Sequence, residues 1–365
     1  RINNNVTTTG TLGINSGAGV NSDVTVATGA TVSGGTTTVT TPSLVVNGTG
    51  IVRSTGAGAD LQISSNAPGN VLNVALNGPT STLQSNSGNV NFNTPLVPGA
   101  ITVTGGPANG VITANGGNGL ANFNGGLTNA VNVSVNQINA CIAGTGTPFN
   151  VAVGQASILG DVRVGPVTSN GDLNFTSPAN LLVCDDLRSN GGNINLTSGN
   201  GAANLIGFAA NADLFANNNV TLTTPNLNLT GGNNTINATT GDVSVQSNTA
   251  GNALTVNMGA GSQINAATAG TGDIFFNPTT AGNISVTGGP ANGLLNAGNT
   301  VSYGGGSVAT NVNQINGSVV SNGLTVTTAS VTTAAGDLNV GPFTSSGTTS
   351  FTANGAGADI ITAGA

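Results

Sequence analysis

The chain has 365 residues, of which 58 are glycine and only 4% are charged, with a formal net charge of −7. All eleven acids are Asp, all four bases are Arg, and Glu, Lys, His and Trp are absent. This composition argues against most enzyme classes, which depend on His, Glu and Lys for proton transfer and nucleophilic attack. It also argues against nucleic-acid binding, because four arginines cannot neutralise a run of phosphates.

Short strands that begin with one small unit recur along the chain. The unit is Gly, then Asn or Asp, then two apolar residues separated by one other residue. It occupies residues 88–92, 160–164, 171–175, 192–196, 241–245, 272–276, 282–286 and 336–340. Alternation with period two places both apolar side chains on one face of a strand. We expect the Gly, Asn and Asp residues to supply the left-handed backbone of a tight corner.

The spacing of these strands predicts an all-β solenoid with parallel pairing. Apolar pairs recur about every ten residues, and strands this short do not suit a sandwich. In a solenoid each strand pairs with the equivalent strand one coil away. Two or three strands per coil give coils of roughly 20–30 residues, about 12–18 coils in all, and a rod on the order of 60–90 Å long.

A longer repeat overlies the short one. Segment 102–110, Thr-Val-Thr-Gly-Gly-Pro-Ala-Asn-Gly, returns at 285–293 with Ser in the first place, an offset of 183. Segments 40–42, 65–70, 135–139 and 164–169 return in the same order at offsets of 176 to 183. We therefore predict two tandem copies of one solenoid, residues 1–183 and 184–365, in one continuous rod.

The duplicated Gly-Gly-Pro-Ala-Asn-Gly loops are the candidates for contact with a ligand. Insertions in solenoids gather on one face, which is often the binding face. The candidate residues are Gly105, Pro107, Asn109, Gly288, Pro290 and Asn292. The alternative is that the loops were inherited with the copy and make no functional contact.

Catalytic and metal sites are disfavoured. Asp185 and Asp186 form the only adjacent acidic pair and Arg188 follows them, but no His or Lys supports polysaccharide cleavage. A structural polar loop is the preferred interpretation. Segment 116–119, Gly-Gly-Asn-Gly, lacks the Asp of a calcium-binding solenoid repeat, so we expect neither a metal nor a cofactor. We ascribe the glycosylation sequons at Asn132, Asn174, Asn195 and Asn219 to chance.

The two cysteines and the two ends each leave an alternative open. Cys141 and Cys184 lie 43 residues apart. Two coils would separate their Cα atoms by about 9–10 Å, so a disulfide between them requires a loop to close the gap. Neither end carries an evident polar cap against end-on pairing. Either the chain belongs to a longer protein, or its ends pair with other subunits and form a filament.

The strand units resemble those of secreted bacterial surface proteins. The runs Asn-Ile-Asn-Leu-Thr-Ser at 193–198 and Asn-Val-Thr-Leu-Thr-Thr-Pro-Asn-Leu-Asn-Leu-Thr at 219–230 are similar to filamentous-haemagglutinin and autotransporter passenger repeats. The resemblance covers nearly the whole chain and is one of composition and period. It implies a right-handed β-helix, export to the cell surface, and adhesive or structural work.

We therefore expect a non-enzymatic extracellular protein that assembles head to tail with copies of itself into a surface fibre or matrix filament. Low charge removes the repulsion that keeps subunits apart. The alternative is an adhesin passenger, a stalk whose duplicated loops contact a host or cell-surface ligand. No stretch reaches the ~20 apolar residues of a membrane helix, so membrane insertion is not expected.

Overall fold

The structure, a computed structural model, describes residues 1–267, 271–278, 282–288, 292–304, 308–312, 314–321, 329–333, 338–340, 349–353 and 359–362. It is 53% strand and 2% helix, so the chain is all-β. The helical residues described are two 3-10 turns, η1 (Pro68–Asn70) and η2 (Asn115–Gly117). The strands pair in parallel with equivalent strands further along the chain, so the fold is solenoid-like.

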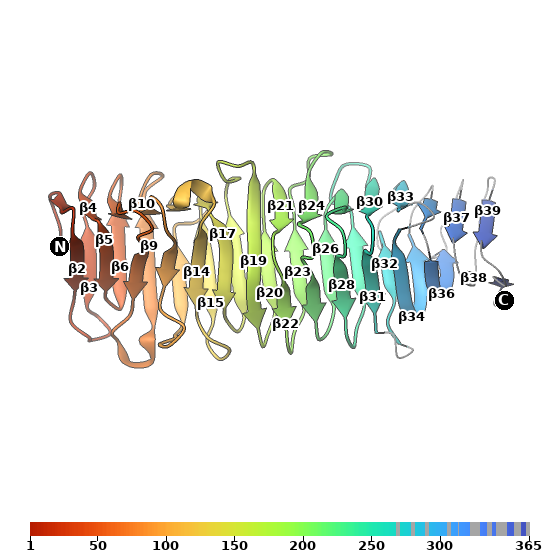
Figure 1. The fold of residues 1–365 in the computed structure, drawn as a ribbon, viewed down its shortest axis with the longest axis horizontal. Coiled ribbons are helices and arrows are strands. Elements are labelled where there is room, and N and C mark those ends of the chain that lie inside the picture. Colours follow the sequence, from red (N-terminus) through yellow and green to blue (C-terminus); the bar gives the residue numbers. More distant parts are fainter. Residues whose placement is uncertain are drawn as a thin grey trace. The chain divides into compact units, whose positions relative to one another are not determined.

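The chain divides into two compact units, Arg1–Pro178 (unit 1) and Ala179–Ala365 (unit 2). Unit 1 has three columns of parallel strands (Figure 1). The first column is β1 (Val6–Thr7), β4 (Thr31–Gly34), β7 (Ile51–Ser54), β10 (Thr82–Ser85), β13 (Val111–Ala114) and β16 (Gln137–Asn139). The second is β2 (Thr11–Asn15), β5 (Thr36–Thr40), β8 (Leu61–Ser64), β11 (Val90–Phe92), β14 (Leu120–Asn124), β17 (Cys141–Thr145) and β19 (Asp161–Ser169). The third is β3 (Asp23–Val26), β6 (Ser43–Asn47), β9 (Leu72–Asn77), β12 (Ile101–Thr104), β15 (Val131–Val135), β18 (Phe149–Val153) and β20 (Leu173–Thr176).

Unit 2 also has three columns. The first is β21 (Asn180–Val183), β24 (Leu205–Phe208), β27 (Asn226–Leu229), β30 (Leu254–Met258), β33 (Ile284–Thr287), β35 (Val308–Asn311), β37 (Ala329–Thr333) and β39 (Thr349–Ala353). The second is β22 (Leu187–Ser189), β25 (Leu214–Ala216), β28 (Thr235–Ala238), β31 (Gln263–Ala266) and the first parts of β34 (Leu294–Tyr303) and β36 (Gln314–Ser321). The third is β23 (Ile194–Thr197), β26 (Val220–Thr223), β29 (Val243–Gln246), β32 (Ile274–Phe276), the last parts of β34 and β36, β38 (Leu338–Val340) and β40 (Ile360–Thr362).

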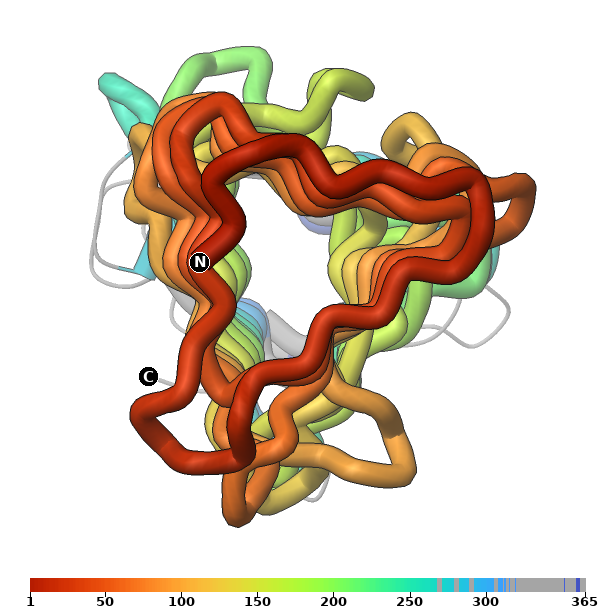
Figure 2. The backbone as a smooth tube through the Cα atoms, turned by 90° about the vertical axis from the view of Figure 1, so that its left-hand side faces the viewer, coloured from red at the N-terminus to blue at the C-terminus, as the bar shows by residue number. Residues whose placement is uncertain are grey.

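Coil length varies because the loops at the corners differ in size. In unit 1, Val131 pairs with Phe149, 18 residues on, whereas Val90 pairs with Ala121, 31 residues on. Viewed from the N-terminus, the coils of unit 1 follow one three-sided outline while their corner loops project to different extents (Figure 2). The strand columns are therefore regular, and the variation is concentrated in the loops.

The core follows the alternation that the sequence predicts. Val243 and Val245 of β29 and Ile274 and Phe276 of β32 are all 0% exposed, whereas the residues between them are half-buried on the outer face. In unit 1 the aromatic side chains of successive coils also stack. The ring centroids of Phe92 and Phe123 lie 4.6 Å apart with nearly parallel planes. Each coil therefore packs its apolar side chains on those of its neighbours.

One prediction about the corners is wrong. Of the predicted corner glycines, Gly160 has a positive φ of 91°, but Gly88, Gly171, Gly241, Gly272 and Gly282 do not. At Gly241 and Gly282 a Cβ atom would collide with Asn219 Oδ1 and the Asn252 carbonyl oxygen of the preceding coil. These two positions need glycine because the coils approach too closely for a side chain.

Asn and Asp residues of the short Gly-Asn/Asp sequence repeat form rows of hydrogen bonds along the coils, which we call the corner ladder. In unit 2, Asn193, Asn219, Asp242 and Asp273 each precede a strand, and the Oδ1 of each accepts a hydrogen bond from a backbone N–H one coil on. In unit 2 the donor–acceptor distances are 3.1 Å for Asn219 to Asn193, 2.9 Å for Asp242 to Asn219, 2.9 Å for Asp273 to Asp242 and 2.9 Å for Thr300 to Asp273. Only an acceptor oxygen is required, which explains why both Asn and Asp occur in the ladder.

Candidate functional site

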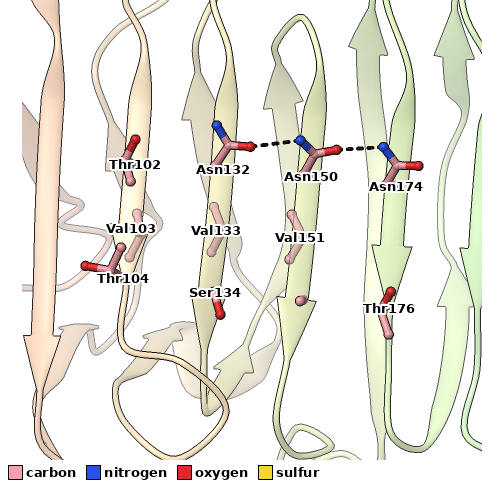
Figure 3. A pocket seen from close by; sticks show the side chains of 11 residues that line it. Thr102, Val103, Thr104, Asn132, Val133, Ser134, Asn150, Val151, Asn174 and Thr176 are labelled. Carbon is pink, nitrogen blue, oxygen red and sulfur yellow. Dashed lines mark hydrogen bonds between the residues drawn. The ribbon is translucent and has the colours of Figure 1, made fainter.

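The outer face of the third column in unit 1 is hollowed into an open groove of about 380 Å³ (Figure 3). Its outward side chains come from β12, β15, β18 and β20 and form two rows. The asparagine row is Thr102, Asn132, Asn150 and Asn174. The small-residue row is Thr104, Ser134, Ala152 and Thr176.

Strand register builds these rows from a repeated local pattern. Val131-Asn-Val-Ser-Val, Phe149-Asn-Val-Ala-Val and Leu173-Asn-Phe-Thr each place Asn second and a small residue fourth. Parallel pairing without a shift then brings equivalent residues side by side. The valines between the two rows point inward, and Val133 and Val151 are each only 3% exposed.

The asparagine row is held rigid by amide hydrogen bonds. Asn174 Nδ2 donates to Asn150 Oδ1 over 2.6 Å, and Asn150 Nδ2 donates to Asn132 Oδ1 over 2.8 Å, as the dashed lines of Figure 3 mark. The Asn132 amide nitrogen makes no hydrogen bond to another described residue, and neither do the hydroxyls of Ser134 and Thr176. None of the lining residues is charged. The groove therefore offers uncharged donors and acceptors that protein partners leave open.

The predicted ligand loop of the first copy, loop 105–110, follows β12 directly and so lies at one end of this groove. The backbone N–H groups of Gly105 and Gly106 donate to the Ser134 carbonyl oxygen over 2.8 and 3.0 Å. A Cβ atom at Gly154 would collide with the Pro107 backbone, so the loop also lies against the residue that follows β18. Pro107 is exposed and Asn109 is half-buried.

The matching loop at 288–293 is described only at its ends. The two loops share one close approach. A Cβ atom on Gly288 would collide with the Asn292 carbonyl oxygen, just as one on Gly105 would collide with the Asn109 carbonyl oxygen. Asn292 Nδ2 also donates to the Gly288 carbonyl oxygen over 3.1 Å. Pro290 lies outside the described residues.

The acidic pair takes part in a second ladder of the same kind. Asp186 Oδ1 accepts from the Asp213 backbone N–H over 3.1 Å, and Asp213 Oδ1 accepts from the Thr235 N–H over 2.6 Å. Burial, followed by the negative charge of Asp186, raises the pKa of Asp213 above its ordinary value of 3.8. Asp185 Oδ1 accepts the N–H of Asp186 over 2.8 Å, so both carboxylates hold backbone groups.

Arg188 lies on β22, with its guanidinium 4.6 Å from the centre of the Phe215 ring. The two side chains line a smaller hollow of about 170 Å³ with Asn217 and Thr239. Arg188 therefore contacts an aromatic ring of the next coil, whereas Asp185 and Asp186 accept hydrogen bonds from backbone N–H groups.

No protein-family model, curated protein or solved structure matches this chain. The resemblance to secreted bacterial β-helix proteins therefore stays a prediction. Neither Cys141 nor Cys184 is a free thiol. They belong to different units, and their pairing with each other also stays a prediction. Among the described residues no three potential ligands of the His, Cys, Asp and Glu types gather as they would around a metal ion. No helix in the described part of the chain is long and apolar enough to span a membrane.

The groove was not predicted from the sequence, although a signal for it was present. Asn132 and Asn174 drew attention only as glycosylation sequons. The stronger signal is that Asn132, Asn150 and Asn174 occupy the same place in three successive third-column strands. That signal becomes visible only when the strands are aligned by register, which the unequal loops conceal.

Proposed function

We propose that the chain is a non-enzymatic structural subunit that joins copies of itself head to tail. The observation that carries this proposal is the coil-on-coil pairing of equivalent strands, which repeats in parallel within each unit. A coil of this kind presents the same backbone groups to the next coil, whether that coil belongs to the same chain or to a second copy.

Strand β2 shows which side chains such stacking would bury. Leu12 and Ile14 are only half-buried, although they follow the inward alternation of β2. The coil of a second copy stacked on β2 would bury both side chains and thereby stabilise the junction.

Tandem duplication supports the same proposal, because equivalent polar contacts recur in each unit. In unit 1 the Ser16 hydroxyl donates to Thr41 Oγ1 over 2.8 Å and Asn66 Nδ2 donates to the Ser16 carbonyl over 2.9 Å. In unit 2 Ser198, Thr224 and Asn248 make the same contacts at 2.8 and 2.9 Å. Assembly would repeat between chains the kind of contact that each unit makes between its own coils.

The finer features of the proposal rest on general rules and on the sequence. Right-handed winding follows from the strong preference for right-handed crossovers between parallel strands. An extracellular location follows from the resemblance to secreted surface proteins. The absence of His, Glu and Lys supports a non-enzymatic role, as does the use of Asp185 and Asp186 as acceptors for backbone groups.

Two lysine substitutions on adjacent residues of β2 test head-to-tail assembly. We expect the unaltered chain to form fibres by electron microscopy and fast-sedimenting species by ultracentrifugation. Leu12→Lys should yield single subunits, because stacking would bury its ammonium group without a partner. Gly13→Lys is the control, since its Cβ has nothing within 4 Å and points outward. Single subunits in the unaltered chain, or equal assembly of both variants, would contradict the proposal.

A second candidate function is that of an adhesin, a stalk that presents a binding surface. The specific observation in its favour is that the groove of unit 1 ends at loop 105–110. A chain that stays monomeric at high concentration and still binds a ligand through this groove would favour the adhesin over the filament.

A further inference from the structure

We infer that the groove of unit 1 binds a linear, uncharged oligosaccharide laid across β12, β15, β18 and β20. This inference goes beyond head-to-tail assembly and does not depend on it. It names the chemical class of ligand for a surface whose asparagine row was not expected to have a function.

The charge of the groove selects the class of ligand. No lining residue is acidic or basic, so the groove has no group that would pair with a phosphate, a sulfate or a carboxylate. A charged ligand would lose hydration without gaining an ion pair. The ligand that suits this surface is therefore neutral.

The hydrogen-bonding groups match sugar hydroxyls. A carboxamide presents both donors and an acceptor, and a hydroxyl does the same. The asparagine row ends at Asn132, whose Nδ2 has no hydrogen-bond partner among the described residues, beside the Thr102 side chain (Figure 3). Because Asn150 is already held by Asn132 and Asn174, little side-chain entropy remains to be lost on binding.

The small-residue row leaves space beside the amides. Ala152 is exposed, and the residues on its two sides, Ser134 and Thr176, are also small. The methyl group of Ala152 gives the C–H face of a sugar ring an apolar surface. Loop 105–110 lies beside this row at the carboxyl-terminal ends of β12 and β15, where the N–H groups of Gly105 and Gly106 donate to the Ser134 carbonyl oxygen.

The geometry also favours a chain-like ligand over a peptide. Equivalent groups recur every ~4.8 Å from strand to strand, so a polymer with a regular run of hydroxyls meets the same kinds of group on successive strands. Extended peptides are usually captured at a free strand edge. Here β15 and β18 are paired on both sides, so the groove offers a peptide no backbone ladder.

Calorimetric titration with defined probes tests the inference. The probes are the neutral hexasaccharides of cellulose, xylan, mannan, chitin and amylose, titrated into the full chain carrying Leu12→Lys so that assembly does not interfere. We expect at least one to bind, Ala152→Trp to weaken it at least tenfold by filling the groove, and Asn150→Leu to weaken it at least fivefold. Gln84→Trp is the control, because Gln84 faces outward on β10 in another column, and binding should change less than twofold.

Three outcomes would overturn the inference. The first is that no neutral hexasaccharide binds. The second is that binding is unchanged by Ala152→Trp while far-UV circular dichroism shows that the variant is folded. The third is that polygalacturonate or an uncharged peptide competes as well as the neutral sugar does. None of these outcomes bears on filament formation, which the Leu12→Lys and Gly13→Lys pair tests separately.

Discussion

Removing the Phe123 ring should locally loosen unit 1 in a way that tests the coil-on-coil account of its core. Phe123 is 0% exposed on β14. Its ring stacks on Phe92 at 4.6 Å and meets Phe149 edge-on at 6.3 Å. Phe123→Ala would therefore remove a fully buried side chain and both of its aromatic ring pairs.

The magnitude follows from these contacts. Truncation of a buried Phe to Ala costs about 3–5 kcal/mol, and each aromatic pair contributes about 0.5–1.5 kcal/mol beyond its buried area. Because both neighbours lose a partner, we expect the upper part of that range, about 4–5 kcal/mol. Phe123→Leu retains most of the apolar volume and loses the two ring pairs, so about 1–3 kcal/mol is expected.

Hydrogen exchange followed by mass spectrometry measures this effect coil by coil. In a solenoid each coil contacts only its neighbours, so faster exchange in Phe123→Ala should be confined to β11, β14, β17 and their flanking strands. Urea unfolding followed by far-UV circular dichroism gives the accompanying free energy. A loss below about 2 kcal/mol, or exchange that rises equally throughout unit 1, would refute the reasoning.

Three further predictions concern polar groups of unit 2. Asp242→Ala should lower the free energy of unfolding by about 1 kcal/mol, because the Asp273 N–H loses its acceptor. Asp242→Asn keeps an acceptor oxygen and should change the free energy of unfolding by less than about 0.5 kcal/mol. Urea titration distinguishes the two variants. The raised pKa of Asp213 means that the folded chain holds this proton more tightly than the unfolded chain, so the stability it contributes at low pH is lost as pH rises through the folded pKa. Asp213→Asn should therefore raise the urea midpoint at pH 7 but not below pH 3.8, and an equal effect at both would contradict this account. Tyr303 is 1% exposed, and within the described residues its hydroxyl makes no hydrogen bond, although the Thr310 side chain lies near it. Tyr303→Phe should therefore raise the thermal midpoint, with an increase of about 1 kcal/mol in stability; a fall would show that the hydroxyl is bonded.

The alternation of residues such as Val243 and Val245 was enough to predict short strands and which side chains are buried, and the spacing of the strands predicted their parallel pairing. The reason for the glycines was mistaken. Gly282 is constrained by the neighbouring coil's Asn252 carbonyl oxygen, a contact between residues 30 positions apart that local backbone rules do not reveal. The groove was missed for a related reason. Asn132 and Asn150 become neighbours only through an 18-residue coil that is shorter than most others in unit 1.

The corner ladder has a consequence for how the protein ages. Spontaneous hydrolysis of an Asn amide to a carboxylate usually destroys a hydrogen-bond donor, but within the described part of the chain Asn89 and Asn219 bond to their neighbours through Oδ1 alone. Conversion of either to Asp would leave the corner bonded and add one negative charge to the outer surface. Positions such as Asp60 and Asp242 already carry that charge in the same contact. A long-lived chain could thus accumulate such lesions along its corners and drift toward a lower isoelectric point while its coils stay in register.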